Sequence, residues 1–382
     1  MILTQCAACA APLGFALGKK CSRCSTRYCG PACQAQHWKE DGHEKFCKKI
    51  RKEGGAEQYN ANKKHAEAVK AATKACAEDT NGQTCYICME VVHPRTGEGL
   101  VRGCVCGDRD GVAAGTTGIA HVSCLAEQAK ILVAEAEENN LDARTLCSKW
   151  ERWNMCSLCE QEYHGVVRCA LGWACWKTYV RRPEGHMLKN NAMTELGNGL
   201  SEVGHHTDAL IVMEADLAMR RSRGTPGNFL LIVQGNLANI YDLVGRHEEA
   251  LEMYRNVYFK KLELYGEEHR STVLSANNYA DTLRSLGRFK ENKSLLRRTI
   301  PMARRVLGEG NDLTIMMRNN YAKALCIDPA ATLEDRREAV RALDETVSIA
   351  RRVFGDSHPL AVQVGTSLRN SRAAFVAHEA SK

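Results

Sequence analysis

From about residue 186 to residue 376, apolar side chains recur with the period of an α-helix, and glycines interrupt them at near-constant intervals. In one such stretch Ala250, Tyr254, Val257 and Tyr258 fall on a single helical face. One series of turns, with spacings of 41 and 42 residues, is marked by Gly204, Gly245 and Gly287. Helical hairpins of this kind bury their apolar faces only by stacking. The pattern therefore predicts a mainly α protein whose C-terminal half is a solenoid of about four repeats.

Three short segments in this half resemble the tetratricopeptide repeat of the kinesin-light-chain type. They are residues 235–241 (GNLANIY), 245–250 (GRHEEA) and 265–269 (YGEEH). The resemblance extends over about residues 188–375 and implies a concave surface that binds extended or helical peptides. In the third repeat Pro301 falls within the second helix, so we expect that helix to be kinked or loosely packed.

Asparagines recur at one position in the first helix of successive repeats, 42 residues apart, at Asn236, Asn278 and Asn320. In the family that these repeats resemble, such asparagines hold the backbone of a bound peptide. The resemblance therefore makes all three candidate partner-binding residues. Alternatively, their side chains bond neighbouring turns or face water.

The first half of the chain is dense in cysteine and lacks long helical periods. Two Cys-rich segments, residues 1–50 and 83–180, flank an Ala-, Lys- and Glu-rich stretch over residues 51–82. That stretch predicts a solvated helical linker, and an Ala/Glu run over 125–139 predicts a further helix. We expect two small modules with little regular structure ahead of the solenoid.

Cysteine usage indicates what holds these modules together. All 19 cysteines except Cys326 precede residue 176, and Cys-x-x-Cys pairs favour metal sites over disulfides. The 44% hydrophobic and 25% charged fractions exclude wholesale disorder and a collagen-like repeat. No apolar run approaches the length of a membrane span and no signal peptide is evident, so we expect an intracellular protein, cytoplasmic or nuclear. The net charge of +7 permits acidic or nucleic-acid partners without requiring them.

The first cluster holds eight ligand-type residues in four pairs. Structural zinc takes four thiolate or imidazole ligands, so eight ligands predict two sites. The free energy of zinc binding, on the order of 10–16 kcal/mol, then replaces the stabilisation that a larger apolar core would give. Residues 21–29 (CSRCSTRYC), 33–38 (CQAQHW) and 43–47 (HEKFC) resemble a MYND zinc finger. That resemblance implies two interleaved sites: Cys6, Cys9, Cys29 and Cys33 for one zinc, and Cys21, Cys24, His43 and Cys47 for the other.

The MYND resemblance also implies binding of short proline-containing peptides. Trp38 and Tyr28 either form a shelf for such a peptide or shield the zinc-bound sulfurs. His37 is a competing imidazole, but it lies nine residues before Cys47, so we expect it not to bind metal. The basic run over residues 45–52 predicts a solvated face rather than a nucleic-acid patch.

The second cluster adds seven cysteines and one histidine, with a single residue between Cys104 and Cys106. This spacing, together with residues 118–125 (GIAHVSCL) and 156–163 (CSLCEQEY), resembles the RING-CH type of zinc finger. The implied cross-brace uses Cys85, Cys88, His121 and Cys124 for one zinc, and Cys104, Cys106, Cys156 and Cys159 for the other. The two clusters together predict four structural zinc ions. We expect Trp150 and Trp153 to pack between the second pair of sites.

RING domains of this family are ubiquitin ligases, which hold a ubiquitin-conjugating enzyme and contribute no catalytic side chain. The resemblance implies a contact through Ile87 and the surface from Leu125 to Gln128, with the MYND finger and the repeats recruiting substrate. Gln128 and Ser157 stand where the family has a tryptophan and a proline. A non-catalytic scaffold is therefore the alternative function, and a transcriptional or chromatin cofactor is a third.

Overall fold

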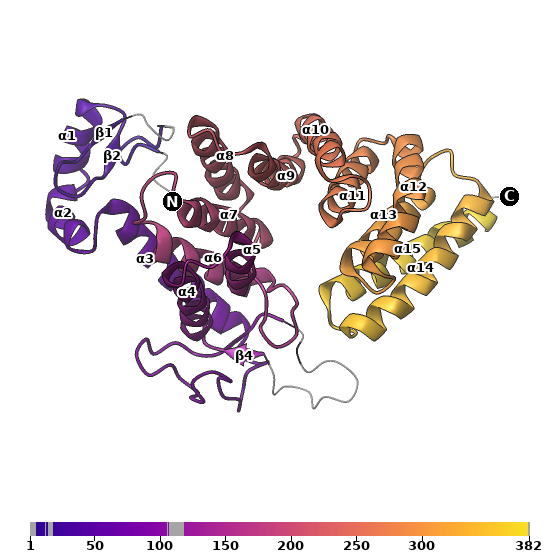
Figure 1. Ribbon diagram of the computed structural model, residues 1–382, viewed down its shortest axis with the longest axis horizontal. Helices are drawn as coiled ribbons and strands as arrows, with labels where there is room; N and C mark the ends of the chain where they lie inside the picture. The colour runs from indigo at the N-terminus through magenta and orange to yellow at the C-terminus, as the bar shows by residue number, and fades with distance from the viewer. Residues whose placement is uncertain (1–4, 12, 14–17, 105, 107–117, 381–382) are drawn as a thin grey trace. The chain divides into compact units, whose positions relative to one another are not determined.

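The computed structural model describes residues 5–11, 13, 18–104, 106 and 118–380. Fifteen α-helices and two antiparallel strand pairs make up this part of the chain (Figure 1). The predicted mainly α fold, with a helical solenoid in the second half, is confirmed. The described residues form two compact units, one ending at Pro226 and the other beginning at Gly227.

The N-terminal zinc module consists of one strand pair and two helices. Strand β1 (Lys19–Lys20) pairs with β2 (Arg27–Tyr28), and helices α1 (Pro31–Lys39) and α2 (His43–Lys52) follow. The fully buried Tyr28 belongs to a small core in which half of the buried residues are cysteines. So small an apolar core cannot stabilise the module alone, as predicted from its composition.

Helix α3 (Ala56–Ala75) occupies the stretch predicted to be a solvated linker. It is helical as predicted, but Ala61, Val69 and Ala72 are buried, and the helix packs against α6 (Gly165–Tyr179). The prediction of a solvated linker is therefore wrong for one face of this helix, which is buried. Alanine side chains, which favour a helix in any environment, here also allow close approach to the neighbouring helix.

The second zinc module begins with a strand pair and continues into helices. Strand β3 (Val101–Arg102) pairs with β4 (Ile119–Ala120), and α4 (Val122–Glu138) confirms the helix predicted from the Ala/Glu run. The Glu98 carboxylate accepts hydrogen bonds from the backbone N–H and hydroxyl of Ser123, at 2.6 and 2.9 Å, and so caps the start of α4.

Two tryptophans predicted to lie between the zinc sites pack elsewhere. Helix α5 (Ala143–Trp150) and the 3-10 turn η1 (Glu151–Trp153) place Trp150 and Trp153 against Tyr179 of α6, with ring centroids 5.3 and 5.8 Å from the tyrosine. That prediction is wrong. Helix α6 is buried over most of its length, so it offers the rings a larger apolar surface than the small zinc clusters do.

Helix α7 (Met187–Glu202) lies along α6 and is followed by α8 (His206–Ser222). Two glycines make the α6–α7 contact close. A Cβ atom at Gly172 would lie 2.9 Å from the Glu195 carbonyl oxygen, and one at Gly199 would lie 2.9 Å from that of Arg168. This hairpin belongs to the unit that ends at Pro226, so the compact units do not divide at residue 186, where the sequence predicts the repeats to begin.

Substituting Gly172 with alanine is expected to destabilise the first unit by about 1–3 kcal/mol, because the helices must move apart. Helix propensity alone predicts the opposite effect, because alanine stabilises a helix by about 1 kcal/mol relative to glycine. Gly235→Ala is the matched control. Gly235 lies within a helix, and a Cβ added there would meet no atom within 4 Å, so that variant is expected to be neutral or stabilising. Urea unfolding of the two variants tests the contrast, and equal effects would contradict it.

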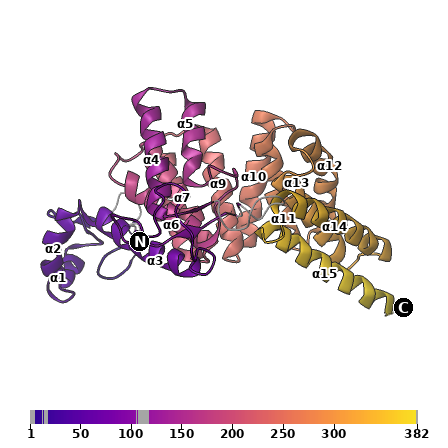
Figure 2. The same cartoon turned by 90° about the horizontal axis from the view of Figure 1, so that it is seen from below.

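The second unit is an array of antiparallel helices (Figures 1 and 2). Its members are α9 (Gly227–Leu243), α10 (His247–Tyr265), α11 (Arg270–Ser285), α12 (Phe289–Leu307), α13 (Asp312–Ile327), α14 (Leu333–Phe354) and α15 (Pro359–Ala380). Gly245 and Gly287 lie in the turns between helices, with φ of 82° and 71°, a conformation that favours glycine. Helix α12 continues through Pro301, and the kink or loose packing expected there stays a prediction. Pro301 is exposed, so water can satisfy the carbonyl that loses its helical partner.

Candidate metal centres and docking surfaces

Four Cys-x-x-Cys turns share one backbone geometry, and each zinc module contains two of them. In each turn the residue after the second cysteine donates its N–H to the carbonyl of the first cysteine, at 2.8–3.0 Å. That residue has a φ of 57–64° although it is not a glycine. The four residues are Ala10, Ser25, Met89 and Glu160. Each such conformation costs about 1–2 kcal/mol, so a stabilising interaction, here the metal, must offset it.

The sixteen predicted ligands lie together in the four predicted sets. Within each set all the ligand atoms lie within 4.8 Å of one another. The sets are Cys6, Cys9, Cys29 and Cys33; Cys21, Cys24, His43 and Cys47; Cys85, Cys88, His121 and Cys124; and Cys104, Cys106, Cys156 and Cys159. Each module therefore has two sites, and in each module the sites interleave along the chain as predicted.

The distances within the sets fit a tetrahedral ion. Zinc–sulfur bonds of about 2.3 Å place neighbouring sulfurs about 3.8 Å apart. Cys9 and Cys29 are 3.7 Å apart, Cys21 and Cys47 are 3.8 Å apart, and Cys106 and Cys156 are 3.6 Å apart, all measured between Sγ atoms. Thiolate and imidazole donors without carboxylates are the ligand types of structural zinc sites. The four clusters are therefore compatible with four zinc ions.

The two histidine ligands use different ring nitrogens. Nε2 of His43 lies 3.3 Å from Cys24 Sγ, whereas Nδ1 of His121 lies 3.4 Å from Cys88 Sγ. The free nitrogen of His121, Nε2, is 3.3 Å from the Val91 carbonyl oxygen and donates to it when Nδ1 binds metal. This hydrogen bond fixes both the tautomer and the orientation of the ring. The Val91 loop therefore supports the ligand set from outside.

His37 is not a ligand, as predicted. Its Nδ1 hydrogen-bonds the Tyr28 hydroxyl at 2.9 Å, and its ring stacks on His43 with centroids 4.8 Å apart. Trp38 packs edge-on against His43 at 5.7 Å and is half-buried. The aromatic rings thus cover the imidazole ligand, while part of Trp38 stays accessible.

Two thiols of the first module resist ionisation beside their neighbours. Burial, together with the hydrogen bond to Cys24, raises the pKa of Cys47 to about 12. The hydrogen bond to Cys29 raises the pKa of Cys33 to about 12. A bound divalent cation reverses this preference, because it stabilises all the thiolates of a set at once. These residues hold zinc by their geometry and chemistry, and the ion supplies a structural cross-link rather than a reactive centre.

Substituting Glu160 with glycine is expected to raise the stability of the second module by about 1 kcal/mol, because glycine adopts a positive φ without strain. Glu127→Gly, on the exposed face of α4, is the matched control and is expected to cost about 1 kcal/mol. Thermal unfolding of the zinc-loaded proteins measures both changes. A loss of stability in Glu160→Gly would argue against a strained turn at this position.

The structure changes the set of partner-binding candidates in the second module. Ile87 is partly exposed, as a docking residue must be, but Leu125 is only 3% exposed and packs in the module's core. The prediction for Leu125 is therefore wrong. It follows the ligand Cys124 within α4, and this position faces the buried side of the helix.

The three asparagines of the repeats have different environments. Asn320 is buried: its Oδ1 accepts from Arg284 Nε at 3.2 Å, and its Nδ2 donates to the Asn277 carbonyl at 3.5 Å. It therefore joins adjacent repeats, which is the alternative given above, and the prediction that it binds a partner is wrong. Asn236 and Asn278 are partly exposed and remain peptide-binding candidates.

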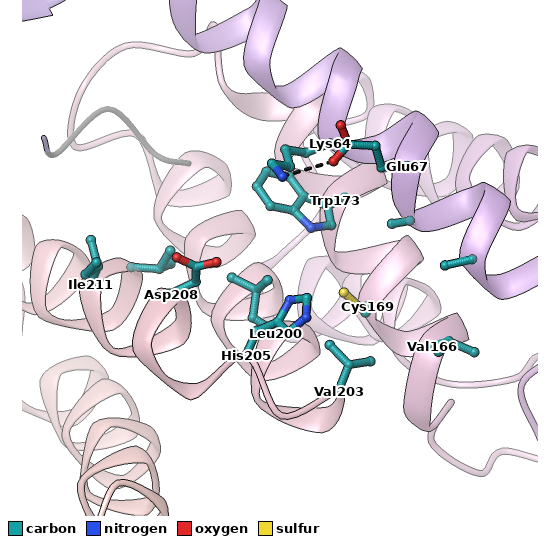
Figure 3. A pocket seen from close by; sticks show the side chains of 13 residues that line it. Lys64, Glu67, Val166, Cys169, Trp173, Leu200, Val203, His205, Asp208 and Ile211 are labelled. Atoms are coloured by element: carbon teal, nitrogen blue, oxygen red, sulfur yellow. Dashed lines mark hydrogen bonds and ion pairs between the residues drawn. The ribbon is translucent and has the colours of Figure 1, made fainter. Parts of the chain in front are cut away.

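The first unit contains a pocket of about 460 Å³ that sequence reasoning missed. Its walls come from α3, α6, α7 and α8, and Figure 3 shows Trp173, Cys169 and Leu200 facing it. Burial raises the pKa of the Cys169 thiol to about 11, so this cysteine is a buried, unreactive group. Nothing in the sequence alone indicates that these four helices enclose one cavity.

Comparison with known families identifies the family of two of the three modules. The MYND finger family model matches residues 6–47. This segment is a MYND finger. The tetratricopeptide repeat model matches residues 231–271, 272–312 and 331–360, so the second unit contains tetratricopeptide repeats. Neither match covers residues 83–180, the segment with the RING-CH-like spacing.

Three solved structures are similar to this chain at low sequence identity. Two are crystal structures of a putative kinesin light chain of Podosopora anserina with nearly identical TPR-like repeats, one of them a variant with a single substitution. Both are 17% identical and cover 61% of this chain and 97% of theirs, with TM-scores of 0.40 for the variant and 0.38 for the other. BtubC (BKLC) from P. vanneervenii is 12% identical over 68% of this chain and 91% of its own, with a TM-score of 0.36.

No curated protein matches the chain. Within the described residues, no helix combines the length and the apolar character that crossing a membrane requires.

Proposed function

We propose that this MYND-finger and tetratricopeptide-repeat protein is a ubiquitin ligase of the RING type. In this proposal the second zinc module holds a ubiquitin-conjugating enzyme, while the MYND finger and the repeats select the substrate. The coarser role, zinc-dependent protein interaction, rests on the two modules that match known families. The ligase role rests on the surface of the second module.

One observation carries the ligase proposal: the first and last Cys-x-x-Cys turns of the second module lie side by side and present apolar side chains to solvent. The Tyr86 hydroxyl and the Ser157 hydroxyl, one from each turn, are 3.1 Å apart. Next to them in sequence, Ile87 and Leu158 are exposed, and Met89 is 70% exposed. Soluble domains rarely leave such apolar groups together unless a partner covers them.

The proposed contact with the conjugating enzyme therefore differs from the one predicted from the sequence. Leu158 of the last turn takes the place that the family resemblance assigns to Leu125, and Ile87 keeps its role. Val91 and Val92 are also exposed and follow the first turn, which extends the apolar surface. In this proposal the conjugating enzyme covers these apolar side chains, which the two zinc sites hold in place.

Recruitment of substrate is assigned to the other modules. Trp38 beside the first zinc pair offers a half-exposed aromatic face for a short peptide, and Asn236 and Asn278 offer amides to a peptide backbone. We also propose an intracellular location, cytoplasmic or nuclear, because zinc-binding thiols persist in reducing compartments. We propose no contact with membranes or nucleic acids.

Purified full-length protein incubated with ubiquitin, activating enzyme and a panel of conjugating enzymes tests the ligase role. We expect ubiquitin chains with at least one conjugating enzyme. Ile87→Ala and Leu158→Ser are each expected to reduce the rate about tenfold or more, as hot-spot residues do. Leu141→Ala is the matched control, because Leu141 is an exposed apolar residue of the same module outside the two turns.

A scaffold without ligase activity is the second candidate. Gln128 and Ser157 favour it, because they occupy positions where an active RING has a tryptophan and a proline. If no conjugating enzyme gives more chains than a Cys85→Ala/Cys88→Ala variant does, the ligase proposal is overturned. The scaffold then remains as the candidate function, provided that Ile87→Ala still weakens the binding of a partner protein.

A further inference from the structure

A polar pocket of about 340 Å³ lies within the first unit and is lined partly by the second zinc module. Its walls come from α3, α4, α6 and the loop over residues 93–96. Among the lining residues that the structure describes, only Ala126 and Ala174 are apolar. Surfaces that bind proteins usually have an apolar centre, so this composition favours a small polar ligand. We call this site the α4–α6 pocket.

The α4–α6 pocket carries an excess of positive charge. Lys177, which is only partly exposed, and Arg95 both line it, and among the described residues neither forms an ion pair with a carboxylate. The third cation, Lys130, pairs at 3.1 Å with Glu127, the one acidic residue in the described lining. Two positive charges therefore remain unbalanced, and they match the charge of one phosphate dianion.

A buried histidine adds a hydrogen-bond donor that the described residues leave unused. His93 lines the pocket and is only 5% exposed. The backbone nitrogen of Thr96 lies 3.2 Å from His93 Nδ1, and because a backbone N–H can only donate, Nδ1 accepts. The neutral ring therefore carries its proton on Nε2. No described residue accepts from Nε2, and buried polar groups rarely lack a partner, so a ligand is the natural acceptor.

A second histidine of the lining, His65, is also neutral. Burial, together with the positive charge of Lys177, lowers the pKa of His65 to about 4, so its ring is uncharged near pH 7. A neutral imidazole donates a hydrogen bond from one ring nitrogen. An anion in the pocket would accept such a bond and would offset the charge of Lys177, which is one of the two causes of the lowered pKa.

We propose that the α4–α6 pocket binds a small organic phosphate monoester, such as a sugar phosphate. The phosphate dianion contacts Lys177 and Arg95 and accepts from His93 Nε2, while the rest of the polar wall holds the attached ring or chain. The volume of the pocket is at the small end of the range for ligand sites, about 300–1,000 Å³. Binding to a membrane by charge requires clusters of about 4–8 basic residues, more than line this pocket.

This inference does not depend on the ligase proposal. Ile87 and Leu158, which carry that proposal, lie outside the α4–α6 pocket. Binding of a small phosphate can therefore be measured whether or not the protein forms ubiquitin chains.

Isothermal titration calorimetry of the full-length, zinc-loaded protein with glucose 6-phosphate tests the proposal. We expect one ligand per chain and a Kd below about 1 mM. Lys177→Met and Arg95→Gln are each expected to weaken binding about tenfold, because each removes one of the two charges that balance the dianion. Glucose 6-sulfate, a monoanion of similar shape, should bind at least about fivefold more weakly than the phosphate.

Matched controls separate the pocket from general charge effects. Lys70→Met and Arg144→Gln remove exposed cations of the same unit outside the pocket, so neither should change the affinity more than about twofold. Zinc content and thermal unfolding establish that each variant is folded. Arg95 is exposed, so Arg95→Gln keeps the test decisive even if Lys177→Met does not fold.

Several results would overturn the proposal. One is the absence of saturable binding below about 1 mM, and another is pocket variants that bind like the wild type. Equal affinity for the sulfate would show that the two unbalanced charges do not select a dianion. Inorganic phosphate that binds as tightly as the sugar phosphate, or binding only to phosphatidic acid vesicles or only to a phosphoserine peptide, would equally overturn the assignment of a small organic ligand.

Discussion

Removing zinc with a chelator is expected to unfold both zinc modules and to leave helices α9–α15 folded. Structural zinc contributes on the order of 10–16 kcal/mol in small peptides, which is comparable to the whole stability of a domain. The first module has a small core, and each module contains two turns with positive φ outside glycine, so the metal makes a large contribution to the stability of both. The second unit contains Cys326 alone among the cysteines and should not respond.

Hydrogen exchange read by mass spectrometry measures this prediction. Amides over residues 18–52 and 84–104 should lose protection in the chelated protein, while those of α9–α15 should exchange as before. Adding back zinc should restore protection and give four ions per chain by elemental analysis. Unchanged protection in the zinc modules, or a content of two ions, would show that at least one of the clusters does not bind metal.

Substituting Glu195 with alanine is expected to destabilise the first unit by about 3–5 kcal/mol. The residue Glu195 is 7% exposed, and its carboxylate forms a salt bridge with Arg168 at 3.0 Å across the α6–α7 contact. It also accepts hydrogen bonds from Trp150 Nε1 at 3.2 Å and Asn154 Nδ2 at 3.1 Å. The substitution leaves the Arg168 charge buried without its partner, which costs more than the pair itself contributes.

Tryptophan fluorescence during urea unfolding isolates this effect, because all five tryptophans precede residue 227. The Arg168→Met/Glu195→Gln double variant is the control. It removes both charges and keeps a side-chain oxygen that accepts from Trp150 and Asn154, so we expect it to lie within about 1 kcal/mol of the wild type. A Glu195→Ala variant that loses less than about 1 kcal/mol would mean that water reaches Arg168.

Ligand grouping and fold class could be predicted from the sequence because both are encoded in local spacing. A two-residue gap between cysteines marks four of the eight ligand pairs, and the other four pairs stand at gaps of one to three residues, so the sixteen ligands could be identified one pair at a time. The family resemblance then supplied the interleaving of the pairs. Glycines at a constant period similarly indicated helix pairs without any knowledge of their packing.

Contacts between distant segments could not be predicted in this way. Leu125 and Asn320 were candidates by position, but the side that a helical residue presents depends on which helices pack against it. Alanine content predicted α3 as a helix, yet nothing local indicated that α6 would cover one of its faces. The 460 Å³ pocket combines residues from four helices, and local spacing in a sequence contains no signal for such a combination.

The close glycine contact between α6 and α7 has a practical consequence for dissecting the protein. A fragment that begins at residue 186 would expose Leu188, Met193 and Leu196, which are buried in the intact chain. Such a fragment would be prone to aggregate, and proteins captured with it would include nonspecific binders. A fragment that begins at Gly227 avoids that bare helix face and is the appropriate bait for partners of the repeats.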